Sequence, residues 1–173
     1  MLVVMAGLPG SGKTTIAVQL STRLDAVLLS KDEVRSALFR PRFIEYSSKQ
    51  DDFCIEVILQ VAGYILRQYP EIAVIVDGRT FSKRAQLQRV KSAADQFGTA
   101  LKIIECVCED ETARERIERQ QGKHFAANRN FELYQRLKRE ADRIELPKLI
   151  LDTDRGNPED NVRAAELYIR APN

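Results

Sequence analysis

A glycine-rich segment close to the N-terminus constrains this chain more than any other feature. Residues 7–14 read GLPGSGKT, which has the spacing G-x-x-x-x-G-K-[ST]. Glycines let the backbone curl until several N–H groups point at one centre, and a helix that begins there adds the positive end of its dipole. The lysine and the hydroxyl that follow suit a phosphate chain and its metal ion. The segment therefore predicts a nucleotide phosphate-binding loop.

The residues around this loop fit the same interpretation. The apolar run at 2–6 has the length of a strand, and Ile16 and Leu20 have the four-residue spacing of a helix. In such a unit the lysine reaches the β- and γ-phosphates, while the next hydroxyl binds Mg²⁺. The predicted nucleotide-binding residues are Gly7, Gly10, Ser11, Gly12, Lys13, Thr14 and Thr15, of which Thr14 is also a predicted Mg²⁺ ligand.

Apolar runs alternate with helical segments along the rest of the chain. Strands are expected at 2–6, 26–29, 72–76, 100–107 and 149–151, and helices after the loop and at 31–39, 51–69, 82–97, 110–121, 131–144 and 158–169. Strands that are apolar on both faces are typical of a parallel sheet covered by helices on both sides, so the expected fold class is α/β. The core-facing side of the helix at 51–69 is expected to carry Phe53, Val57, Val61, Tyr64 and Ile65.

Composition narrows the class of protein. The chain has 173 residues, of which 44% are hydrophobic and 30% charged, and its net charge is +2. These values are typical of a soluble globular protein, and the length suits a single domain over 1–173. No run approaches the roughly 18 apolar residues of a membrane span. Three cysteines without CxxC spacing indicate reduced, buried thiols in a cytoplasmic protein, and one histidine gives little support to a histidine metal site.

Polar residues after the second predicted strand are the first candidates for chemistry, because ligands of parallel α/β sheets bind outside the carboxyl ends of the strands. Ser30 to Glu33 has the S-x-x-E pattern of a helix cap, and Asp32 would complement the helix dipole there. Alternatively, Asp32 is a general base, with Arg35 beside it one turn later. A cap can also fix the helix that aims the base, so both interpretations stay open.

Acidic residues also follow the third and the last predicted strands. Asp77, at the end of an apolar run, would bind Mg²⁺ directly or through water, unless Asp77-Gly78 is only a turn. Asp152 would lie near the nucleotide base, although turn chemistry also explains its position. The sequence therefore predicts Asp77 as a metal ligand and Asp152 as a nucleotide-binding residue.

Arginines gather after the fourth predicted strand. Many of them belong to solvated helix faces or to i,i+4 ion pairs, such as Arg119 with Glu115. Phosphoryl transfer, however, needs cations over the migrating group, and a closing lid often supplies them. We predict a lid around 120–130, with one or two of Arg116, Arg119 and Arg129 acting in transfer.

Together these motifs make the chain similar to the small P-loop kinases that include polynucleotide 5′-kinase domains, chloramphenicol phosphotransferase and zeta-toxin-like proteins. The resemblance rests on Gly7–Thr14, on Asp32 with Arg35, on Asp77 and on the region 116–129. It implies a P-loop NTPase fold with a five-stranded parallel sheet in the order 2-3-1-4-5. It also implies that Asp32 activates an acceptor hydroxyl and that Arg35 holds the acceptor or a phosphate.

We therefore predict a P-loop kinase domain that transfers the γ-phosphate of ATP to a hydroxyl of a small molecule. Catalytic roles are predicted for Lys13, Asp32, Arg35 and the lid arginines. The acceptor would lie near the basic residues Arg40, Arg42 and Lys49. Two alternatives remain: a polynucleotide 5′-hydroxyl kinase, and a nucleotide-dependent switch or ATPase without a kinase acceptor. A cavity beside Asp32 would favour a kinase, whereas a filled site would favour the switch. No obligatory protein partner is inferred.

Overall fold

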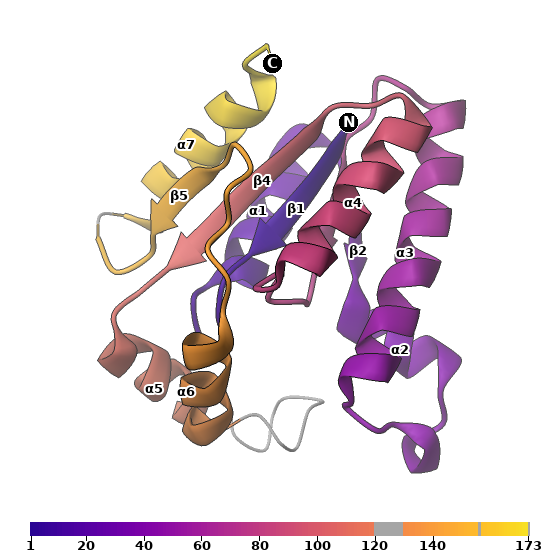
Figure 1. Cartoon of the computed structure of the whole chain (residues 1–173). Helices are drawn as coiled ribbons and strands as arrows, with labels where there is room; N and C mark the ends of the chain where they lie inside the picture. Colours follow the sequence, from indigo (N-terminus) through magenta and orange to yellow (C-terminus); the bar gives the residue numbers. More distant parts are fainter. Residues whose placement is uncertain (120–129, 156, 173) are drawn as a thin grey trace.

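A parallel β-sheet between two layers of helices forms the centre of the molecule (Figure 1). The computed structural model describes residues 1–119, 130–155 and 157–172. The strands are β1 (Leu2–Ala6), β2 (Val27–Ser30), β3 (Val74–Asp77), β4 (Leu101–Val107) and β5 (Leu149–Asp152). The helices are α1 (Lys13–Leu24), α2 (Lys31–Leu38), the 3-10 helix η1 (Pro41–Phe43), α3 (Ser48–Gln68), α4 (Arg84–Phe97), α5 (Asp110–Arg119), α6 (Phe131–Glu140) and α7 (Pro158–Arg170).

The strand order is β2-β3-β1-β4-β5, and all neighbouring strands are parallel. This confirms the expected fold class and the order that the resemblance implied. The central strand β1 is completely buried, with Val4 opposite Val76 of β3 and Ile103 of β4. Burial on both faces explains why this strand reads as a continuous apolar run.

Two hydrophobic clusters, one on each face of the sheet, hold the layers together. On one face, Ile16 and Leu20 of α1 and Val162 of α7 pack against Val3 and Met5 of β1. On the other, α3 and α4 pack against the alternate strand residues, which include Leu2, Val4 and Val76. Because successive residues of a strand point to opposite faces, β1 contributes to both clusters.

The buried side of α3 is not the one expected from its sequence. Phe53 is 53% exposed and Tyr64 63% exposed, and the buried stripe runs instead through residues such as Cys54, Ile58 and Ala62. Both stripes have helical spacing, so periodicity alone cannot choose between them. The choice follows from close packing, because Gly63 on the buried stripe leaves room for the ring of Phe97 in α4. The prediction was therefore wrong for Phe53, Val61 and Tyr64, whereas Ile65 does pack against the core cluster.

The end of α6 also differs from expectation. The helix ends at Glu140, although helical character was expected to Ile144. The N–H of Asp142 donates to the carbonyl of Ser82 at 2.8 Å, and Ile144 is buried in the core cluster of α3 and α4. A tertiary hydrogen bond and burial of an apolar side chain thus replace the last helical turn. Among the described helices, none is long and apolar enough to cross a membrane.

All five strands run in the same direction, so their carboxyl ends share one edge of the sheet. In Figure 1, α5 and α6 lie beyond this edge, and α2 lies at the side of β2. Ala113, Ile117 and Tyr134 form a separate small core between α5 and α6. Cys108, expected to be buried, lies just past β4 and is half-buried against this small core, whereas Cys106 is buried in the sheet. The candidate site occupies this edge.

Candidate functional site

The glycine-rich loop joins β1 to α1 and has the backbone shape that its glycines allow. Gly12, the residue before α1, has φ +81°, in the left-handed region that favours glycine. A Cβ on Gly7 would lie 2.2 Å from the carbonyl oxygen of Cys106 in β4, so only glycine permits this close approach. The ammonium group of Lys13 donates to the Leu8 carbonyl at 2.8 Å, which keeps the cation beside the loop. Backbone N–H groups, a helix N-terminus and a lysine are therefore brought together as phosphate binding requires.

Thr14 and Asp77 meet at the start of α1, as their predicted metal roles require. The Thr14 hydroxyl donates to Asp77 Oδ2 at 2.7 Å, although 63 residues separate the two in the sequence. Asp77 is 1% exposed, and its other oxygen, Oδ1, is buried with no hydrogen-bond partner in the described part of the chain. A buried carboxylate oxygen beside a hydroxyl fits Mg²⁺, which takes few protein ligands and completes its shell with water and phosphate oxygens.

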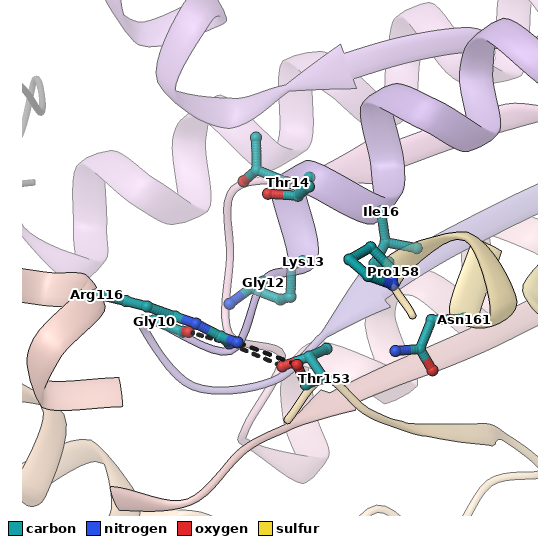
Figure 2. A pocket seen from close by; sticks show the side chains of 10 residues that line it. Gly10, Gly12, Lys13, Thr14, Ile16, Arg116, Thr153, Pro158 and Asn161 are labelled. Atoms are coloured by element: carbon teal, nitrogen blue, oxygen red, sulfur yellow. Dashed lines mark hydrogen bonds between the residues drawn. The ribbon is translucent and has the colours of Figure 1, made fainter. Parts of the chain in front are cut away.

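One cavity, of about 380 Å³, lies along the loop and the start of α1. Its other walls come from α5, from the segment after β5 and from the first residues of α7. Figure 2 shows Arg116 reaching from α5 to Gly10 and Thr153. Arg116 Nη1 donates to Gly10 O at 3.2 Å and to Thr153 Oγ1 at 2.8 Å, and Nη2 donates to Thr153 O at 3.0 Å. The guanidinium thereby ties the loop to the segment after β5 at the wall of this cavity.

Asp152 does not line this cavity. Its side chain accepts from the N–H of Asp154 at 3.0 Å and pairs with Arg155, so it stabilises the turn after β5. Thr153, Pro158 and Asn161 form the cavity wall in this region (Figure 2). The structure therefore favours the turn interpretation of Asp152. Thr15 and most of the other predicted loop residues, in contrast, do line the first cavity.

A second cavity, of about 580 Å³, adjoins the first at Lys13 and Thr14. Asp32 and Arg35 of α2 lie in its wall, beside Arg79 from the segment after β3. The wall is completed by residues of α3, α4 and α6. The loop lysine thus borders both cavities, and the acid predicted as a general base borders the second.

A network of buried charges forms the floor of the second cavity. Lys31 Nζ donates to Asp51 Oδ1 at 2.9 Å, and Arg35 donates to Asp32 at 2.9 Å and also to Asp51. Arg79 pairs with Asp52 at 2.7 Å and lies 3.6 Å from Asp51 Oδ2. The cations of this network are nearly buried, Arg35 with 2% of its surface exposed. Asp51 therefore holds together three cations, two from α2 and one from the segment after β3.

The Asp32 carboxylate does not cap its helix, because another residue takes that role. The hydroxyl of Ser30 accepts from the backbone N–H of Glu33, so α2 does not need the Asp32 carboxylate as its cap. Arg35 and Lys31 both lie against Asp32 Oδ1, at 2.9 and 3.5 Å. Within the described residues, Asp32 Oδ2 makes no hydrogen bond or ion pair, and Asp32 lines the second cavity.

Lys31 carries an altered pKa in this environment. Burial is the main cause that lowers the pKa of Lys31 to about 8; Asp32 opposes this shift, and the neighbouring cations Arg35 and Arg79 contribute to it. Burial likewise lowers the pKa of Arg79. Desolvation disfavours the charged form of both groups, which is why these pKa values fall although carboxylates lie close by.

The structure does not bring every predicted site residue to these cavities. Arg119 is exposed and paired with Glu115 at 3.1 Å, as its i,i+4 spacing suggests. Arg129 and residues 120–129 of the lid predicted around 120–130 lie outside the described residues. Three basic residues that were expected near an acceptor are exposed and do not line the second cavity, namely Arg40, Arg42 and Lys49.

Sequence reasoning missed several residues of the second cavity. Lys31 and Asp51 were counted as helix residues, and Arg79 as part of a turn, because no short motif marks them. Tyr46 was missed as well, although its ring lies 5.1 Å from the guanidinium of Arg35 and closes one side of the network. The only signal in the sequence was position, since Arg79 comes two residues after the predicted metal ligand at the end of β3.

Several solved structures share this fold over nearly the whole chain. A sugar kinase from Janibacter sp. HTCC2649 has a TM-score of 0.72 and 18% identity, covering 97% of this chain and 93% of that one. The Mycobacterium tuberculosis APS kinase CysC, in complex with AMPPNP and APS, has a TM-score of 0.71 and 18% identity, with 98% and 97% covered. Kti12 from Chaetomium thermophilum, in complex with ADP-AlF3, has a TM-score of 0.67 and 20% identity, with 98% and 97% covered.

These similarities to solved structures establish the fold, and a match to a protein-family model adds the family. No curated protein sequence matches the chain. A sequence model described as an AAA domain does match, over residues 2–146, which include the glycine-rich loop, Asp32, Asp77 and Arg116. Since this match spans most of its length, the chain belongs to the AAA_33 family of AAA domains.

Proposed function

We propose that the protein is an ATP-dependent kinase that transfers the γ-phosphate of ATP to a hydroxyl of a small molecule. The observation that carries this proposal is the second cavity, which meets the first at Lys13 and has Asp32 in its wall. A phosphoryl donor along the loop and a hydroxyl beside Asp32 would face each other across Lys13. The cavity volume of about 580 Å³ falls within the range of small-molecule sites.

The chain's own residues would divide the chemistry as follows. Asp32 would take the acceptor proton through its available oxygen, while the hydroxyl oxygen forms a bond to the γ-phosphorus and the bond to the β–γ bridging oxygen breaks, releasing ADP. Arg35 would fix the orientation of Asp32 through their 2.9 Å contact. Lys13 would offset charge on the phosphates. Mg²⁺ held by Thr14 and Asp77 would supply further neutralisation of that charge.

Two competing functions account less well for these features. A nucleotide-dependent switch or ATPase has no need for an open cavity beside Asp32, so the cavity favours transfer to an acceptor. A polynucleotide kinase needs a groove that follows a nucleic acid strand. The net charge of +2 and the absence of a long basic run in the sequence favour a small acceptor.

The kinase proposal is tested with Asp32→Asn, which keeps the shape of the side chain but cannot accept a proton. We expect near-normal ATP binding and transfer slowed by about 10²–10⁴, the usual contribution of a general base. Glu33→Gln is the matched control, because Glu33 also lies in the first turn of α2 but does not line the cavity. Transfer would be followed as ADP release across hydroxylated metabolites, nucleosides, antibiotics and a 5′-hydroxyl oligonucleotide. Intact transfer with only a loss of thermal stability in Asp32→Asn would refute the base assignment.

A further inference from the structure

The second cavity contains an arginine whose bonding is incomplete. Arg79 is 7% exposed. Of its nitrogens, only Nη2 lies within hydrogen-bonding distance of a carboxylate in the described residues, at 2.7 Å from Asp52. Its Nε and Nη1 are buried without a hydrogen-bond partner in the described part of the chain, and so is Nε of Arg35. Buried donors without acceptors are rare because each loses its hydrogen bonds to water. These unsatisfied groups therefore point to a binding partner.

The charges around Arg79 favour an anion as that partner. The cavity wall carries seven cationic side chains and four carboxylates. One of the cations is Lys13, which faces the nucleotide, and another, Arg89, pairs with Glu56 outside the wall. Even without these two, the cations of the wall outnumber its carboxylates, and a neutral ligand would leave that excess uncompensated.

Two of the remaining cations have no carboxylate partner in the part of the chain that the structure describes. Arg136 projects from α6 into the cavity wall without an ion pair, and Lys83 donates only to the backbone carbonyl of Glu140. These two side chains leave a surplus of positive charge at the wall, beside Lys31, whose pKa is lowered to about 8 mainly by burial. An anion bound there would relieve this surplus.

We propose that the acceptor is a small alcohol that carries an oxyanion group, either carboxylate, phosphate or sulfate. This inference rests on the proposed kinase function and adds the substrate class. The oxyanion would be bound by Arg79 and Arg136, while the hydroxyl would lie at Asp32. The cavity volume of about 580 Å³ suits a metabolite-sized molecule and not a polynucleotide segment.

Matched pairs of alcohols test the substrate class by their phosphorylation. We would compare glycerol 3-phosphate with glycerol and gluconate with sorbitol, and use a short 5′-hydroxyl oligonucleotide as the polynucleotide probe. The expected result is a kcat/KM at least about tenfold higher for the anionic member of a pair, since losing one charged contact typically changes affinity by that factor or more. Equal use of both members would overturn the anionic-acceptor inference and leave the kinase proposal intact. Labelling of the oligonucleotide alone would overturn the small-molecule assignment.

Binding of inorganic sulfate to protein saturated with Mg²⁺ and ADP tests the site without turnover. Arg79→Met should lower the affinity for sulfate about tenfold, and Arg79→Lys should restore part of it. Arg136→Ala should lower the affinity about threefold. Because Arg136 is exposed, its substitution tests the site without a change in the core. Arg139→Ala is the control, because Arg139 lies on the same helix outside the cavity wall. Sulfate binding that depends on Arg79, without transfer to any alcohol, would refute the kinase and keep the anion site. Sulfate binding unaffected by both Arg79→Met and Arg136→Ala would refute the anion site.

Discussion

Asp51 provides the sharpest test of how the second cavity is built. Its carboxylate accepts from Lys31 at 2.9 Å and from Arg35, and lies 3.6 Å from Arg79. In Asp51→Asn, one amide oxygen remains to accept, but the negative charge that balances these cations is gone. The substitution changes neither the volume nor the helical position of the residue. Any loss of stability therefore reports mainly on the charge network.

The size of the effect follows from burial. Removing one partner of a fully buried ion pair costs about 3–5 kcal/mol, because the remaining charge stays desolvated without compensation. The Arg35 side chain is 2% exposed, but that of Asp51 is 25% exposed, so water offsets part of the loss. We expect Asp51→Asn to lower the free energy of unfolding by about 3 kcal/mol.

Asp52→Asn is a matched control at the next position of α3. The Asp52 side chain is 48% exposed and, within the described residues, pairs only with Arg79, so its loss should cost about 1 kcal/mol. Both free energies would be measured by urea unfolding at neutral pH, with a check that the m-values stay equal. Equal losses in the two variants would show that Asp51 does not organise the network as described here.

Three further changes test the loop, the titration of the cavity and the packing of α3. Lys13→Ala should lower ATP affinity and turnover together without loss of fold, measured by calorimetry and ADP release, and unchanged values would refute the loop assignment. Because the pKa of Lys31 falls from 10.5 to about 8 on folding, the unfolded chain holds more protons between these pH values, and stability should rise with pH there. Burial raises the pKa of Cys106 to about 12, which makes stability fall with rising pH and so opposes the effect of Lys31. The measured quantity is therefore the slope of the unfolding free energy against pH in the wild type minus the same slope in Lys31→Met. A zero difference would contradict the lowered pKa of Lys31. Gly63→Ala should destabilise by about 1–3 kcal/mol in thermal unfolding, since its Cβ would lie 2.5 Å from the Phe97 ring, and a stabilised variant would contradict this packing.

Local features of the sequence were enough to predict the fold class and the nucleotide loop. The glycines, the lysine and the hydroxyl of the loop occupy consecutive positions, so their geometry depends on a short stretch of chain. The apolar runs became strands within one or two residues of their expected ends, because burial on both faces of a parallel sheet requires such runs. Asp32 and Asp77 were predicted as candidate site residues from their positions after apolar runs, because parallel topology gathers such side chains at one edge.

Contacts between distant segments decided the rest, because they depend on how surfaces fit together. The buried side of α3 was chosen by the fit of Phe97 against Gly63, which helical spacing does not encode. The network around Asp51 joins residues of α2, α3 and the segment after β3, and none of them belongs to a motif. Hydrophobic periodicity records which residues avoid water, whereas a charge network forms only after packing has removed water from around it. The sequence by itself therefore determined the fold class and the phosphate loop, and tertiary packing determined the shape and charge of the second cavity.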